Sequence, residues 1–137
     1  KKILKLDHWK ITGIGPRLQP RMRDIRGITN KTINLFDKNF VNKLNFEYLD
    51  YNEINWDLSF YGNGYGLSTI ESMNAIKLLA ELEAIFLDPV YTGKAMSGLI
   101  NYAKNNKIDN DSSVIFIHSG GLPNLFTYSD ELNRQRQ

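Results

Sequence analysis

Two tyrosines stand where a phenol could take part in chemistry. Tyr65 lies within the glycine-rich stretch GNGYG at residues 62–66, and Tyr91 directly precedes Thr92. A phenol can stack against a ligand ring and can also donate or accept a proton, so both tyrosines are catalytic candidates. The alternative is that they are two ordinary half-buried tyrosines among the 7 in the chain.

A second candidate site is the turn formed by Ser119, Gly120 and Gly121. Glycines after a strand can present backbone amides to an anion, although two glycines in this position more often form only a tight turn. The preceding His118 could act as a general base or a ligand. Because His8 is its sole companion, we favour a packed or surface histidine and expect no histidine-built metal site.

Lys94 is a third candidate for chemistry. A lysine can form a Schiff base when it is desolvated. The alternative is a solvated lysine near the start of a helix, which is commonplace.

The elements that must position these residues are clearest from residue 62 onward. Ser68 and Glu71 predict a capping box, so a helix should start near Thr69 and end at about Glu83. Its apolar residues recur at intervals of three and four, which predicts one stripe facing a core. The stripe consists of Ile70, Met73, Ile76, Leu79, Ala80 and Leu82.

The later segments alternate between helix and strand. Asp88-Pro89 ends a short buried strand or turn at residues 84–87, and Thr92 is the expected N-cap of a helix that fades at residues 105–107. Residues 114–118 predict a buried strand, and Pro123 predicts a short helix through Tyr128. This order is typical of an α/β fold, in which ligands bind at the carboxyl ends of strands, here at Ser119.

The first 61 residues are rich in Asn, Lys and Asp and have weak periodicity. Glycines and prolines divide residues 11–22 into turns and loops, and a short helix is expected over residues 36–44. We therefore predict two regions: a divergent segment at residues 1–61 and a better-ordered part at residues 62–137.

Composition narrows the class of protein. The chain has 137 residues, a net charge of +2 and no cysteine, which excludes disulfides and thiolate chemistry. So weak a positive charge does not indicate a nucleic-acid partner, and no apolar run approaches the length of a membrane helix. A cytoplasmic protein is the default expectation.

Three stretches carry a resemblance to a known family. They are GYGL at residues 64–67, LAELEAIFLDPVYTGKAMSGLI at 79–100, and VIFIHSGGLPNLFTY at 114–128. Together they resemble the C-terminal portion of the D-cysteine desulfhydrase and aminocyclopropane-carboxylate (ACC) deaminase family. These are pyridoxal 5'-phosphate (PLP) enzymes of the tryptophan-synthase-β type. The implied fold is part of the three-layer α/β/α fold type II, with an open, mostly parallel sheet flanked by helices.

The resemblance implies roles for matched residues. Thr92 and Ser119 would converge on the pyridine nitrogen of PLP, and Gly66 and Gly120 would allow close backbone approach. Tyr91 would hold or deprotonate bound substrate, and Tyr65 would stack near it. In the deaminase branch, the resemblance implies glutamate and leucine at the positions of Thr92 and Ser119. The residues present here therefore favour the desulfhydrase branch. The implied reaction is therefore conversion of D-cysteine and water to pyruvate, sulfide and ammonia.

Other features depart from the family pattern. IRGIT at residues 25–29 resembles a sheet strand of the cofactor domain, but TGIGPRLQP at 12–20 lacks the family's phosphate-binding glycine turn. The resemblance thus implies that residues 1–61 are a divergent remnant of the cofactor domain and that residues 62–137 are the C-terminal part of the PLP-binding domain. The lysine that holds PLP covalently lies in the N-terminal half of family members, and Lys94 matches a different lysine. We expect a C-terminal half or a short copy of the enzyme, with a small D-amino acid as substrate, and either a homodimer or a missing N-terminal half as partner. The alternatives are a non-catalytic binding domain and an ACC deaminase.

Overall fold

The computed structural model describes residues 9–15, 22–36, 39 and 55–134. The chain divides into two compact units. The first contains residues 1–13 and 19–56, and the second contains residues 14–18 and 57–137. The two regions predicted from the sequence, 1–61 and 62–137, remain a prediction.

The first unit contains helix α1 (Met22–Ile33). The strand expected at residues 25–29 is wrong, because these residues form part of α1. The Thr29 hydroxyl donates to the Ile25 carbonyl one turn earlier across 2.8 Å, which is how a threonine is accommodated within a helix. The helix expected over residues 36–44 lies mostly outside the described residues.

A two-stranded sheet pairs β1 (Thr12–Ile14) with β2 (Asn55–Asp57). At the strand starts, Asn55 Nδ2 donates to Thr12 Oγ1 across 2.7 Å. At their ends, the Gly15 amide donates to the Asp57 carbonyl across 2.9 Å. Residue numbers rise together along both strands, so the pair is parallel.

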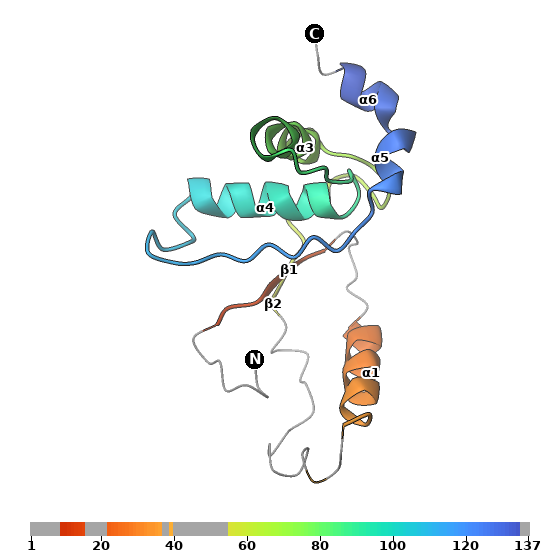
Figure 1. The fold of residues 1–137 in the computed structure, drawn as a ribbon, viewed down its shortest axis with the longest axis vertical. Coiled ribbons are helices and arrows are strands. Elements are labelled where there is room, and N and C mark those ends of the chain that lie inside the picture. The colour runs from red at the N-terminus through yellow and green to blue at the C-terminus, as the bar shows by residue number, and fades with distance from the viewer. Residues whose placement is uncertain (1–8, 16–21, 37–38, 40–54, 135–137) are drawn as a thin grey trace. The chain divides into compact units, whose positions relative to one another are not determined.

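Helices α3 (Ile70–Glu83) and α4 (Thr92–Lys104) pack against each other in the second unit (Figure 1). The predicted start and end of α3 are confirmed. Its capping box is formed by Thr69 and Ser72, not by Ser68 and Glu71. The Thr69 side chain accepts from the Ser72 amide and the Ser72 hydroxyl accepts from the Thr69 amide, each across 3.0 Å. Thr69 has the extended backbone that an N-cap requires, so the box is shifted by one residue.

The core of this unit is built from Met73, Ala75, Ile76, Leu87 and Met96. Two predicted stripe residues, Met73 and Ile76, are therefore correctly placed. Ile70 and Leu82, at the two ends of α3, are exposed and were wrongly assigned to the core. Gly93 allows the helices to approach closely, because a Cβ there would lie 3.1 Å from the Ile76 side chain and 2.6 Å from the Asp88 carbonyl.

The buried strand predicted at residues 114–118 is wrong. Residues 112–121 form neither helix nor strand, and Ile115 and Ile117 are 71% and 78% exposed. β-Branched residues favour extended backbone, but a strand also needs a neighbour for its hydrogen bonds. The described residues provide none there.

The remaining elements follow the sequence closely. Residues 84–88 are an irregular segment that begins with Ala84 in the left-handed conformation (φ 54°), so neither the buried strand nor the turn expected at residues 84–87 is found. Helix α5 (Pro123–Thr127) has Tyr128 as its C-cap, within one residue of the predicted end, and α6 (Ser129–Arg134) follows it. Within the described residues, no helix is long and apolar enough to cross a membrane.

Candidate functional site

The glycine-rich segment between β2 and α3 carries Tyr65. Gly62 and Gly66 both have positive φ, 72° and 79°, which glycine adopts without strain. The Leu67 amide donates to the Gly64 carbonyl across 3.4 Å and closes a turn around Tyr65. This local geometry leaves the Tyr65 side chain half exposed.

The structure brings Tyr65 and Tyr91 together. Their hydroxyl groups are hydrogen-bonded to each other, and their rings meet edge to face with centroids 6.2 Å apart and an interplanar angle of 66°. Both rings are partly exposed, at 46% and 37%. Two paired phenols at a surface can share and relay a proton toward a ligand placed above them. The catalytic roles suggested for these tyrosines remain a prediction.

Asp88 holds the start of α4 and was missed as a site residue. It is fully buried, and its carboxylate accepts the backbone amides of Val90 and Tyr91 across 2.9 Å and of Thr92 across 2.8 Å. A carboxylate that caps amides at a helix N-terminus also interacts favourably with the helix dipole. The signal was present in the sequence, because aspartate followed by proline is a common start of such a turn.

Thr92 is the first residue of α4 rather than its N-cap, which is Tyr91. The Thr92 hydroxyl donates to Asp88 Oδ1 across 2.7 Å and accepts from the Asp88 amide across 2.8 Å. The residue is 1% exposed. Because this hydroxyl donates its proton in the hydrogen bond to the carboxylate, it retains one free lone pair. In this arrangement it would act toward a further group as an acceptor.

The Ser119 turn lies against the same carboxylate. Gly121 has φ 91°, and a Cβ there would lie 2.6 Å from Asp88 Cγ and Oδ1. Ser119 itself is exposed. Gly120 has φ 108° and no heavy atom within 4 Å of the position its Cβ would occupy. The turn therefore meets the segment before α4 through Gly121, while the roles of Ser119 and Gly120 in binding remain a prediction.

His118 is fixed by backbone groups. Its Nε2 lies 2.9 Å from the Phe86 carbonyl, and its Nδ1 accepts from the Gly120 amide across 3.3 Å. These contacts favour the interpretation of His118 as a packed surface histidine that shapes the turn.

Tyr128 is a further residue at this site that the sequence did not reveal. Its hydroxyl donates to the Gly66 carbonyl, which links α5 to the glycine-rich segment. Burial, followed by the negative charges of Glu131 and Asp88 and by Tyr65, raises the pKa of Tyr128 above its usual value. Tyr128 therefore remains a protonated donor at neutral pH.

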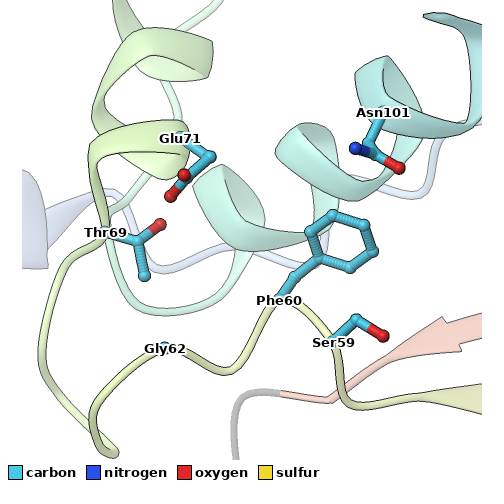
Figure 2. Close-up of a pocket in the computed structure, with 6 residues that line it drawn as sticks. All are labelled: Ser59, Phe60, Gly62, Thr69, Glu71 and Asn101. Atoms are coloured by element: carbon cyan, nitrogen blue, oxygen red, sulfur yellow. The ribbon is translucent and has the colours of Figure 1, made fainter.

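A polar pocket of about 220 Å³ lies between the segment after β2, the start of α3 and one face of α4 (Figure 2). It is lined by Ser59, Phe60, Gly62, Thr69, Glu71 and Asn101. Tyr65 and Tyr91 do not line it, so the candidate site is the exposed surface around the phenol pair.

A flat aromatic cofactor is compatible with part of this surface. Open space lies above Gly66 and Gly120, since nothing occupies the 4 Å around either missing Cβ. Ser119 is exposed, and the hydrogen-bonded phenols of Tyr65 and Tyr91 are partly exposed. Lys94 does not offer a covalent anchor, because its ammonium donates to the carbonyls of Tyr61 and Gly64.

Comparison with known proteins decides the family. The model of the pyridoxal-phosphate-dependent enzyme family matches residues 5–120 of this chain. The chain belongs to the pyridoxal-phosphate-dependent enzyme family. The α/β fold class and the cofactor class expected from the sequence are thus confirmed.

A solved structure described as an ACC deaminase homologue agrees with this assignment. It is 30% identical to this chain, superposes with a TM-score of 0.61 and matches 90% of the chain. The match covers 34% of that protein, so this member of the PLP-dependent family spans about one third of its length.

Proposed function

We propose that this chain forms the wall facing the pyridine ring and the substrate in a PLP-dependent lyase acting on D-cysteine. The hydroxyl pairing of Tyr65 with Tyr91 carries the proposal, since two phenols that are partly exposed and hydrogen-bonded to each other suit transfer of a proton to or from a substrate. The reaction converts D-cysteine and water to pyruvate, hydrogen sulfide and ammonia. When bound, PLP supplies an electron sink for the carbon that loses its proton.

The residues of this chain would divide the work. Tyr91 would hold the substrate or take up its proton, and Tyr65 would stack beside it, with its hydroxyl hydrogen-bonded to that of Tyr91. Thr92 and Ser119 would flank the pyridine nitrogen. Ser119 would donate its neutral hydroxyl, which does not force a positive charge on the ring as a carboxylate would. Thr92 would donate in the same way only after releasing its hydrogen bond to Asp88. A less strongly charged ring suits a reaction in which negative charge leaves promptly with sulfur.

A PLP-binding experiment tests the foundation of this proposal. PLP is added to the purified protein, binding is followed by absorbance, and borohydride reduction with peptide mass spectrometry locates any lysine that holds the cofactor. Saturable binding weakened by Ser119→Leu supports the proposal. Lack of binding would leave the alternative of a non-catalytic domain with this fold.

ACC deamination is the second candidate function, favoured by the 30% identity to an ACC deaminase homologue. In that reaction ACC and water yield a four-carbon 2-oxo acid and ammonia. The PLP-loaded protein should be offered D-cysteine and ACC in parallel, with sulfide and the 2-oxo acid as readouts. Sulfide formation supports the desulfhydrase assignment, and the 2-oxo acid alone overturns it in favour of deamination.

Variants at the two pyridine-facing positions sharpen this choice. Thr92→Glu combined with Ser119→Leu introduces the two residue types expected at these positions in the deaminase branch. If the desulfhydrase assignment is right, the double variant should lose sulfide release and gain ring opening of ACC. An unchanged product ratio would contradict the roles proposed for Thr92 and Ser119.

A further inference from the structure

Lys94 is a buried cation that the proposed chemistry does not use. It is 1% exposed, and it is among the largest fully buried side chains of the described residues. A buried charge is costly unless it is well bonded. The Lys94 ammonium donates to the Tyr61 carbonyl across 2.6 Å and to the Gly64 carbonyl across 3.2 Å, and lies 5.4 Å from the centre of the Tyr61 ring.

These partners belong to the segment that presents Tyr65. Tyr61 begins that segment and Gly64 directly precedes Tyr65, so the ammonium fixes two carbonyls across one flexible turn. The glycines at 62, 64 and 66 give this turn little conformational preference of its own. Its geometry therefore depends on contacts from outside, and Lys94 provides two of them.

Lys94 is also close in sequence to Tyr91, the other member of the phenol pair. It is the third residue of α4, and Tyr91 is the N-cap of that helix. Asp88 holds the Tyr91 amide across 2.9 Å. The segment bearing Tyr91 is thus fixed at its backbone, and Lys94 ties the segment bearing Tyr65 to the same helix.

We propose that Lys94 is a positioning residue that clamps the Tyr61–Gly64 turn and so holds the Tyr65 hydroxyl on that of Tyr91. Its relevance to catalysis rests on the proposed function, whereas the clamp itself needs no cofactor. Methionine in its place would fill similar volume but leave the carbonyls of Tyr61 and Gly64 without this donor. Burial lowers the pKa of the Lys94 ammonium, in keeping with an enclosed position.

The coupling between the two phenols tests the clamp directly. The protein is labelled with 3-fluorotyrosine, and the fluorine resonances of Tyr65 and Tyr91 are assigned with Tyr→Phe variants. In the parent protein, Tyr65→Phe should shift the Tyr91 resonance, because it removes the hydroxyl partner. In a Lys94→Met background the same substitution should leave the Tyr91 resonance in place.

The matched control is Lys104→Met, which alters an exposed lysine on the same helix. It should preserve the response of Tyr91 to Tyr65→Phe. The Tyr102 resonance, whose hydroxyl bonds Asp57, should be unchanged in every variant. If Tyr91 still responds to Tyr65→Phe in folded Lys94→Met protein, the clamp is refuted.

A measurement on the unaltered protein keeps the proposal testable if Lys94→Met does not fold. With lysine ¹⁵Nζ and carbonyl ¹³C labels, the Lys94 ammonium should give a slowly exchanging signal coupled to the carbonyl carbons of Tyr61 and Gly64. A rapidly exchanging Lys94 signal with no such coupling would overturn the clamp.

Activity measurements separate this inference from the proposed function. In PLP-loaded protein that releases sulfide from D-cysteine, Lys94→Met should lower kcat by about 100-fold with unchanged PLP affinity, as expected for misplaced reacting groups. Unaltered kcat with lost phenol coupling would contradict the catalytic relevance of the clamp. Sulfide release absent from all variants, with the coupling intact in the parent, would refute the proposed function and leave the clamp standing.

Discussion

A single carboxylate organises the start of α4 (Thr92–Lys104). Asp88 is 0% exposed, yet it accepts three backbone amides and the Thr92 hydroxyl. Each of those donors would be left unpaired by removal of the side chain, and an unpaired buried donor costs more than the bond it loses. Asp88 therefore determines both the stability of the helix start and the position of Tyr91.

We expect Asp88→Ala to lower the free energy of unfolding by about 3 kcal/mol, since it combines loss of a cap with several unsatisfied buried donors. Urea denaturation followed by circular dichroism measures the change. Asp109→Ala, at an exposed position, should change stability by less than about 0.5 kcal/mol. Equal effects of the two variants would contradict the role given to Asp88.

At the scale of elements, the turn at residues 119–121 fits the α4 start because it has no side chain at its point of contact. Gly121 combines a φ of 91° with a Cβ position 2.6 Å from the Asp88 carboxylate, whereas Gly120 has a φ of 108° and open space. Both glycines avoid backbone strain, and Gly121 also avoids a collision. These two positions form a matched pair.

Gly121→Ala should therefore be more destabilising than Gly120→Ala by at least about 1 kcal/mol, the typical cost of overpacking. Thermal unfolding of both variants gives the comparison. Because the collision displaces Asp88, Gly121→Ala should also weaken amide-exchange protection at Thr92. Similar melting temperatures for the two variants would show that the turn does not pack on Asp88.

A second link between elements joins β2 to α4. The Tyr102 hydroxyl donates to Asp57 Oδ2 across 2.5 Å. Burial, the hydrogen bond to Asp57 and the negative charge of that carboxylate raise the pKa of Tyr102 to about 12. Burial alone would raise the pKa of Asp57, but hydrogen bonds from Tyr102 and Ser59 and the charge of Lys107 outweigh it and lower that pKa.

The raised pKa of Tyr102 predicts that the free energy of unfolding falls at alkaline pH. The folded state favours the protonated Tyr102 phenol, so its contribution is complete below the ordinary value of 10.0 and is lost as pH rises toward about 12. Tyr102→Phe should flatten the fall in unfolding free energy over this window, as measured by denaturation at a series of pH values. An equally steep fall in Tyr102→Phe and in the parent protein would contradict the assignment.

At the scale of the whole molecule, the chain leaves a long apolar stretch in contact with solvent. Ile115 and Ile117 are 71% and 78% exposed, and Phe126 is 76% exposed. Exposed apolar side chains that lie close together in a chain favour association with other chains. The purified chain should therefore self-associate as its concentration rises.

The double substitution Ile115→Thr and Ile117→Thr should reduce that association without reducing the free energy of unfolding. Threonine keeps the β-branched shape, and no core contact is lost at these exposed positions. Sedimentation velocity over a concentration series measures the association. The matched control Leu35→Thr alters an 87% exposed side chain outside this stretch and should leave association unchanged.

The sequence by itself determined the features that depend on neighbouring residues. The limits of α3 followed from a capping signal near Thr69 and from apolar periodicity, and α5 with its C-cap at Tyr128 followed from the proline at its start. The glycine turns were also visible, because positive φ is a local property of the backbone. The tyrosines at 65 and 91 were identified as candidates from their types and their local setting.

Tertiary structure alone decided which distant residues meet. Tyr65 and Tyr91 are 26 residues apart and Tyr128 is 62 residues from Gly66, and no local pattern encodes those contacts. The same reason explains the error at residues 114–118, since a β-branched segment becomes a strand only where another backbone can pair with it. The strand at residues 25–29 was expected from the family resemblance alone, and these residues are helical. Lys94 shows the principle most clearly: its sequence setting suggests a solvated lysine, and packing of the glycine-rich turn onto α4 makes it a buried one.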